Sequence, residues 1–273
     1  GRNGDCMIRD ITIGQYYKAD SVIHRLDPRV KLMGTLIFII SLFMGMNIWI
    51  YAVVTVALAV VIKMSRIPLK FMVRGLKSIV ILIIISAVFN LFLTPGDVLI
   101  QIWKLTITYQ GLKMAIFMVV RLIYLIVGTS LMTLTTTPNN LTDGLEKGLG
   151  FLKVIKVPVH EIAMMMSIAL RFIPILIEET DKIMKAQMAR GADFENGSII
   201  RRAKAMVPIL VPLFVSAFRR ANELAMAMEA RCYHGSEGRT KMKPLKYEKR
   251  DRIAYISMVL SLGVIIIVKI IAA

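Results

Sequence analysis

Long apolar stretches alternate with short basic segments along most of the chain. Five stretches of mainly apolar residues stand out, and they cover residues 32–46, 48–62, 78–94, 112–134 and 253–271. Each is a candidate transmembrane helix, because about 20 apolar residues in helical conformation cross the hydrocarbon core of a bilayer. The pattern therefore predicts an all-α, polytopic membrane protein with about five transmembrane helices.

The first two stretches are short, and basic residues decide whether they form one helix or two. A single helix over residues 32–62 would be about 46 Å long, which exceeds the thickness of the hydrocarbon core. Arg29 and Lys31 precede the pair, and five basic residues without any acidic residue follow it in 63–77. Positively charged flanks stay in the cytoplasm, so we expect the chain to turn back at Gly45–Asn47.

The same rule orients the rest of the chain. The loop 95–111, placed outside, has a single basic residue, Lys104, whereas basic residues are frequent in 135–252. The N-terminus then lies in the cytoplasm, and the C-terminus lies on the other side of the membrane. The predicted parts are a cytoplasmic N-terminal segment (1–31), a four-helix transmembrane region (32–134), a cytoplasmic coupling domain (135–252) and a last transmembrane helix (253–273).

Composition narrows the class of protein. Hydrophobic residues make up 56% of the chain, yet the formal net charge is +17, a combination that ordinary soluble domains do not show. The basic residues follow the membrane topology instead of gathering with aromatic residues, so we expect a lipid bilayer and no nucleic acid as partner. Cys6 and Cys232 lie far apart in segments placed in the cytoplasm, where free thiols are expected.

The segment after the fourth apolar stretch has helical periodicity mixed with charge. Asn139 or Thr142 is a candidate cap for a short helix that ends near Gly148 and Gly150. Apolar residues then recur every three or four positions from 159 to 190, which predicts a long amphipathic helix kinked near Pro174. A second such helix is expected over residues 198–231, with two prolines in an apolar run too short to span a membrane.

Charge pairs and apolar residues mark different faces of these two helices. Glu178 with Lys182 and Asp181 with Lys185 have the spacing of intrahelical ion pairs. Methionine packs adaptably, which favours a contact surface for a membrane partner, although plain core packing is the simpler interpretation. The candidate contact residues are Met164, Met165, Met166, Met206, Leu210 and Phe214.

Each long helix ends in a similar triplet. The triplets are Ala189-Arg190-Gly191 and Ala230-Arg231-Cys232. An arginine near a helix C-terminus complements the helix dipole, and glycine is a common residue after the last turn, so one triplet alone indicates only a cap. Two triplets on the same side of the membrane indicate a pair of equivalent docking sites.

These triplets, together with the run from Ser21 to Leu32 (SVIHRLDPRVKL) and the order of the apolar stretches, carry a family resemblance. The chain resembles the transmembrane scaffold subunit of energy-coupling factor transporters, the T component or EcfT/CbiQ family. The resemblance covers nearly the whole chain, from about Asp20 to Arg231 and the last span. It implies a multi-pass protein of a bacterial or archaeal cell membrane.

The resemblance also implies partners and site residues. In the family, two Ala-Arg-Gly motifs dock into two ABC-type ATPase subunits, which bind the ATP, and a small substrate-binding membrane subunit, the S component, lies on the remaining helix surface. Carried over, the docking residues are the two triplets, and the function is to couple ATP hydrolysis to import of vitamins or metal ions. Cys232 replaces the glycine of the motif, which leaves open whether Gly235 provides the turn.

Other classes of protein are weaker interpretations. The chain has no complete H-E-x-x-H motif, no G-x-S-x-G and no glycine-rich phosphate loop, so we expect no catalytic residue, metal site or cofactor in this chain. A stand-alone secondary transporter or channel remains the alternative, with Arg121 and Asn90 as its polar groups within the apolar stretches. Arg121 either faces the bundle interior or lines a substrate path.

Overall fold

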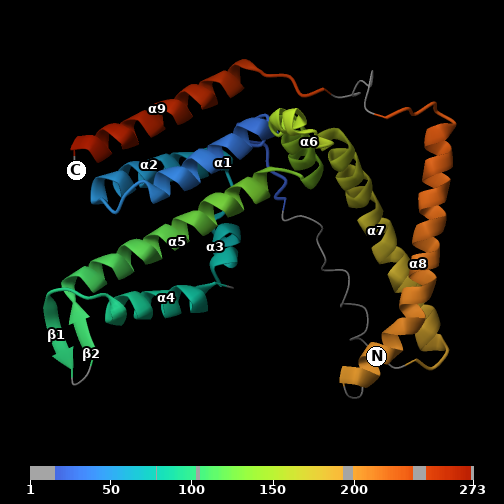
Figure 1. The fold of residues 1–273 in the computed structure, drawn as a ribbon, viewed down its shortest axis with the longest axis horizontal. Helices are drawn as coiled ribbons and strands as arrows, with labels where there is room; N and C mark the ends of the chain where they lie inside the picture. The colour runs from blue at the N-terminus through green and yellow to red at the C-terminus, as the bar shows by residue number, and fades with distance from the viewer. Residues whose placement is uncertain (1–15, 78, 103–104, 193–198, 236–243, 272–273) are drawn as a thin grey trace. The chain divides into compact units, whose positions relative to one another are not determined.

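The computed structural model describes residues 16–77, 79–102, 105–192, 199–235 and 244–271. Within these ranges the chain is mainly helical (Figure 1). One compact body contains the described residues up to 145 and from 245 on, and another contains those from 146 to 244. The α-helices are α1 (Pro28–Phe43), α2 (Ile48–Ser65), α3 (Leu69–Lys77), α4 (Val80–Leu93), α5 (Tyr109–Thr135), α6 (Pro138–Gly148), α7 (Val159–Ala189), α8 (Ile199–Glu229) and α9 (Lys249–Ile271).

The predicted helical hairpin is formed by α1 and α2. The Asp27 carboxylate accepts a hydrogen bond from the main-chain N–H of Arg29, at 2.9 Å, and so caps the start of α1. The Asn47 side chain caps α2 in the same way, because it accepts from a main-chain N–H of the first turn. The turn therefore falls between Phe43 and Ile48, where the basic flanks predicted it.

Apolar packing joins this hairpin to the last helix of the chain. Leu42 of α1 and Ile50 of α2 lie in one buried cluster with Ile265 of α9. A second buried cluster joins α3 to α5 and includes Met72 and Leu131. Helix α3, which follows the basic turn after α2, was not predicted, because its nine residues are amphipathic and too few to stand out as a span.

The loop 95–111 contains a β-hairpin, which the sequence analysis did not predict. Strand β1 (Val98–Ile102) pairs antiparallel with β2 (Leu105–Thr108), and Ile102 pairs with Leu105. Both strands are rich in isoleucine, valine and threonine, residues that favour extended backbone. The hairpin is a small addition to an otherwise helical fold.

Length and hydropathy identify four helices of the described chain as long and apolar enough to cross a membrane, namely α2, α5, α7 and α9. Helix α4 is also apolar but has 14 residues. The fold is that of an all-α polytopic membrane protein. Helix α7 meets the same criterion although its pattern predicted a cytoplasmic helix, since its apolar window precedes the charged segment that begins at Glu178.

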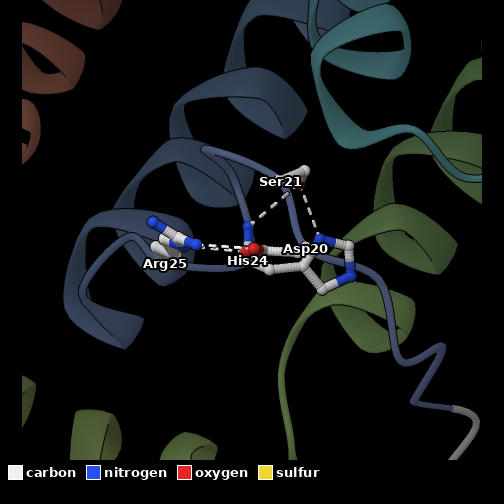
Figure 2. A network of polar contacts seen from close by, with 4 residues as sticks. All are labelled: Asp20, Ser21, His24 and Arg25. Atoms are coloured by element: carbon white, nitrogen blue, oxygen red, sulfur yellow. Dashed lines mark hydrogen bonds and ion pairs between the residues drawn. The ribbon is translucent and has the colours of Figure 1, made fainter.

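Polar contacts fix the segment before α1 (Figure 2). The Ser21 hydroxyl lies 2.7 Å from Nδ1 of His24, and Nε2 of His24 lies 3.0 Å from the main-chain oxygen of Tyr17. Arg25 forms an exposed ion pair with Asp20. Burial lowers the pKa of the His24 imidazole below its ordinary value of 6.5, because charge is disfavoured away from water.

Two buried charged residues tie the ends of three helices together. Asp251, at the start of α9, is 2% exposed and accepts hydrogen bonds from the main-chain N–H groups of Asp27 and Glu248. The Lys31 ammonium donates to the main-chain oxygens of His24 and Thr135, at 3.1 and 2.8 Å. These contacts join the start of α1 to the end of α5 and the start of α9, so this end of the body is held by charge-assisted hydrogen bonds.

Helices α7 and α8 form most of the second body. The preceding helix, α6, begins earlier than predicted: its first turn is capped by Thr137, whose hydroxyl accepts from the N–H of Asn140 at 3.3 Å, and not by Asn139 or Thr142. Its end at Gly148 agrees with the prediction, and a 3-10 helix (Gly150–Ile155) leads to α7. Helix α7 continues through Pro174 to Ala189.

Candidate docking site

The first triplet forms a compact cap at the end of α7. The N–H of Gly191 donates to the oxygen of Met188 at 3.0 Å, and the N–H of Ala192 donates to the oxygen of Gln187 at 3.0 Å. This is the Schellman pattern of helix ends, in which one residue adopts a left-handed conformation. Gly191 takes that conformation, with φ of 89°.

The second triplet forms the same cap at the end of α8. The N–H of Cys232 donates to the oxygen of Glu229 at 2.9 Å, and the N–H of Tyr233 donates to the oxygen of Met228 at 3.1 Å. Cys232 itself adopts the left-handed conformation, with φ of 54°. Gly235 also has positive φ but lies beyond the cap. The replacement of glycine by cysteine therefore leaves the hydrogen bonds of the tip unchanged.

The side chains of the two arginines at these caps are accessible. Arg190 and Arg231 are exposed, and within the described parts of the chain neither guanidinium has an ion-pair or hydrogen-bond partner. A guanidinium offers five N–H donors in a planar arrangement that matches a carboxylate. The arrangement can therefore bind an acidic group of another molecule at each tip.

Helices α7 and α8 run in opposite directions where they meet. Glu179 of α7 forms an ion pair with Arg220 of α8 at 3.0 Å, and Gln187 donates from Nε2 to the main-chain oxygen of Pro208 at 3.4 Å. From Glu179 to Gln187 along α7, the contacted position on α8 moves back from Arg220 to Pro208, so the two helices are antiparallel. The two tips consequently extend from the crossing in opposite directions, as the ribbon of α7 and α8 shows (Figure 1).

The charge pairs predicted within α7 are absent. Neither Glu178 with Lys182 nor Asp181 with Lys185 comes within ion-pair distance in the described chain. Exposed pairs of this kind gain little, because fixing two long side chains costs entropy. Glu179 makes the inter-helix contact instead, and the sequence analysis missed it because the partner is 41 residues away.

The candidate contact residues for a membrane partner lie on both long helices. Met165 is 59% exposed and Phe214 is 61% exposed, whereas Met164 is half-buried and has contacts within the chain. The others, Met166, Met206 and Leu210, are exposed. Five of these six residues are thus exposed, Met164 is partly exposed, and their role as a contact surface stays a prediction.

Arg121 lies near the middle of α5, inside the first body. Its Nε donates to the hydroxyl of Tyr51 at 3.0 Å, and its Cζ lies 5.1 Å from the ring centre of Phe43. The guanidinium thus contacts a phenol and an aromatic face, and no acidic side chain of the described chain lies within ion-pair distance of it. Asn90 donates to the main-chain oxygen of Ser86 within α4. These two polar groups lie on different helices and share no contact that would form a site.

Of the two cysteines predicted to be free thiols, the structure describes one. Cys232 is a free, exposed cysteine at the tip of α8. Cys6 lies outside the described residues. Groups of three or more histidine, cysteine, aspartate or glutamate side chains that could hold a metal ion do not occur among the residues whose positions are given.

Comparison with known proteins identifies relatives over most of the chain. A family model described as the cobalt transport protein CbiQ matches residues 19–242. The energy-coupling factor transporter transmembrane protein EcfT of Clostridium kluyveri is 57% identical over 250 residues, which are 91% of this chain and 93% of that protein. The proteins of the same name from Thermosediminibacter oceani and Bacillus subtilis are 56% and 47% identical over 250 and 254 residues, which are 92% and 93% of this chain and 94% and 96% of those proteins.

Proposed function

Because the chain belongs to the CbiQ family of transporter membrane proteins, together with the EcfT proteins, we propose that its two arginine tips dock a pair of ATPase subunits. Membership makes the chain the transmembrane component of an energy-coupling factor transporter. The observation that carries the docking proposal is that both helix ends form the same cap. Arg190 and Arg231 each stand at an exposed Schellman turn with a guanidinium free to bind.

The proposed role of each arginine is to pair with a carboxylate in a groove of one ABC-type ATPase subunit. Partial burial in such a groove makes a charged hydrogen bond stronger than it is on an open surface. ATP binds to the partner subunits, and this chain supplies no catalytic group. When the two ATPases close around ATP, helices held at both tips move with them and pass the motion to the membrane helices.

The exposed apolar residues support a second contact, with a small substrate-binding membrane subunit. Met165, Met206 and Phe214 present flexible or aromatic side chains to the surroundings of α7 and α8. Methionine side chains adapt to different partner surfaces. We propose that the bound subunit carries the transported solute, a vitamin or a metal ion, so that this chain selects no substrate itself.

Charge reversal at the tips tests the docking proposal. The variant with both Arg190→Glu and Arg231→Glu is co-expressed with the two ATPase subunits and the S component of the same genome, and the ATPases that co-purify are quantified. We expect a loss of at least about tenfold, because two charged contacts become repulsive. The matched control, Lys185→Glu with Arg219→Glu, changes the same charge at exposed positions away from the caps. Co-purification of the tip variant at the level of the control would refute the proposal.

The proposed topology places the N-terminus and both tips in the cytoplasm. Cys232, a free and exposed thiol, reports the side directly. In intact cells that express a Cys6→Ser chain without the ATPase subunits, it should resist a membrane-impermeant maleimide, and it should react after permeabilisation. Reaction in intact cells would invert the proposed orientation.

A chain that acts as a scaffold should move no solute alone. Reconstitution of the purified chain into vesicles without its partners is expected to give no flux of vitamins or metal ions. Flux under these conditions would favour the alternative, a stand-alone transporter or channel, and Arg121 would then be the first residue to substitute.

A further inference from the structure

The ion pair between α7 and α8 joins equivalent positions of the two helices. Glu179 precedes Arg190 by eleven residues, and Arg220 precedes Arg231 by eleven residues. Each helix therefore extends about 16 Å from the ion pair to its arginine, at 1.5 Å per residue. The two arms therefore have the same length. Because the helices run in opposite directions at the crossing, the arms point away from each other.

Equivalent positions that meet across a two-fold crossing would repel each other if they carried the same charge. Here the charges are opposite: α7 has Glu178 and Glu179 where α8 has Arg219 and Arg220. In a two-fold interface the same surface patch meets itself, so equivalent positions near the axis lie opposite each other. The chain combines two helices of the same register with complementary charges at the point where they meet.

Burial shows which member of each charged doublet faces the partner helix. The side chains of Glu179 and Arg220 are 25% and 35% exposed, whereas Glu178 and Arg219 are exposed. On α8, Ile209 and Ser216 are buried and lie eleven and four residues before Arg220, at the spacing of one helix face. Glu179 and Arg220 are therefore part of the packed crossing, whereas Glu178 and Arg219, the outer residues, are exposed.

The relation holds for the arms and not for every contact. Gln187 contacts Pro208, but the described chain shows no corresponding hydrogen bond between Ser167 and Met228, the positions that the same shift would relate. The two helices thus have in common the distance from the ion pair to the arginine tip, and not their other contacts.

We infer that Glu179 and Arg220 are a positioning pair, which holds the crossing so that both arginine tips reach a two-fold-related pair of ATPase subunits at once. The inference rests on the proposed function. Two linked contacts bind far more tightly than either alone, but only when the geometry permits both together. If the crossing slides along one helix, the arm of that helix changes in length while the other arm stays the same, so the separation of the tips changes and the second contact is lost.

Charge exchange across the crossing tests the inference in the assembled transporter. Glu179→Arg places two arginines opposite each other, and we expect at least a fivefold loss of co-purified ATPase. Glu179→Gln, a milder change, should give a smaller loss. The exchange of both residues, Glu179→Arg with Arg220→Glu, restores opposite charges and should return ATPase recovery to within about twofold of the original chain. These expectations follow from a contact that double-mutant cycles can isolate.

Glu178, the exposed neighbour of Glu179, provides the matched control. Glu178→Arg makes the same change of charge one residue away, at an exposed position, and should leave ATPase recovery unchanged. Equal losses for Glu178→Arg and Glu179→Arg would overturn the inference, because general charge would then explain both. Failure of the double exchange to recover assembly would also overturn it.

A distance measurement separates this inference from the docking proposal. Spin labels on Cys232 and on Ala189→Cys, with Cys6→Ser to remove the other thiol, report the separation of the tips in the full chain without ATPases. We expect one narrow distance distribution, a broader or shifted one for Glu179→Arg, and recovery in the double exchange. An unchanged distribution in Glu179→Arg would refute the positioning role, whatever the tip variants do to docking.

Discussion

The two bodies use charged side chains in opposite ways. In the first body, Asp251 is 2% exposed and Lys31 is buried, and each is bonded to main-chain groups of other segments. In the second body, Arg190 and Arg231 are exposed and make no ion pair or hydrogen bond within the described chain. The two buried charges of the first body thus stabilise the fold, whereas the two exposed arginines of the second body are available to a partner.

The largest expected effect is the loss of a buried charge. Asp251→Ala leaves the N–H groups of Asp27 and Glu248 without acceptors in a buried site. We expect a cost of about 2–4 kcal/mol in stability, seen as a lower thermal midpoint and a lower yield of purified chain. Glu178→Ala, which removes an exposed acid, serves as the control and should behave like the original chain. Equal midpoints for the two variants would contradict the structural role of Asp251.

Substitution of one tip should affect assembly far more than stability. Arg190→Glu and Arg231→Glu, made separately, should each lower ATPase co-purification by about tenfold, since loss of one contact also removes the gain from linkage. The thermal midpoint of the chain alone should fall by only about 1–4 degrees, because an acid at a helix C-terminus loses the favourable interaction with the helix dipole. Assembly is measured by pull-down and stability by a thermal shift of the detergent-solubilised chain. A strong effect at only one tip would contradict their equivalence.

The two caps themselves should differ slightly. Cysteine at positive φ costs about 1 kcal/mol relative to glycine, because its Cβ crowds the neighbouring carbonyl. Cys232→Gly should therefore stabilise α8 slightly, and Gly191→Cys should destabilise α7 by a similar amount. Hydrogen exchange of the terminal amides measures both effects. Opposite signs would contradict the matched geometry of the caps.

The smallest expected effect is a dependence on pH in the segment before α1. Burial lowers the pKa of His24, so the unfolded chain takes up a proton at higher pH than the folded chain. Stability from this residue is complete above pH 6.5 and declines as the pH falls below that value. His24→Gln should reduce the decline in thermal midpoint between pH 7 and pH 5.5. An unchanged pH profile would show that other groups dominate.

Hydropathy allowed the sequence to predict most of the first body. The stretch 48–62 corresponds to α2 (Ile48–Ser65), and 112–134 corresponds to α5 (Tyr109–Thr135), because long apolar runs have few other stable conformations. The β-hairpin in 98–108 was missed, since the membrane pattern gives no signal for short structure in a loop. The position of each domain boundary stays a prediction.

The candidate site was predictable in its local part only. The arginine tips and their glycine or cysteine cap follow from residues adjacent in sequence, and Cys232 takes the conformation that the motif requires. The contact of Glu179 with Arg220 depends on how two helices cross, which local periodicity does not encode.

The central claim is that each arginine tip lies against an ATPase subunit, and photocrosslinking tests it most directly. In a chain with Cys6→Ser, used for every variant here, a benzophenone maleimide on Cys232, the native thiol of the second tip, is irradiated in the assembled transporter, and the adducts are identified by mass spectrometry. The first tip is tested with Gly191→Cys in a Cys232→Ser chain, and Met165→Cys on the apolar surface is the control. We predict ATPase adducts from both tips and none from position 165. Adducts with the ATPase from position 165 but from neither tip would contradict the claim.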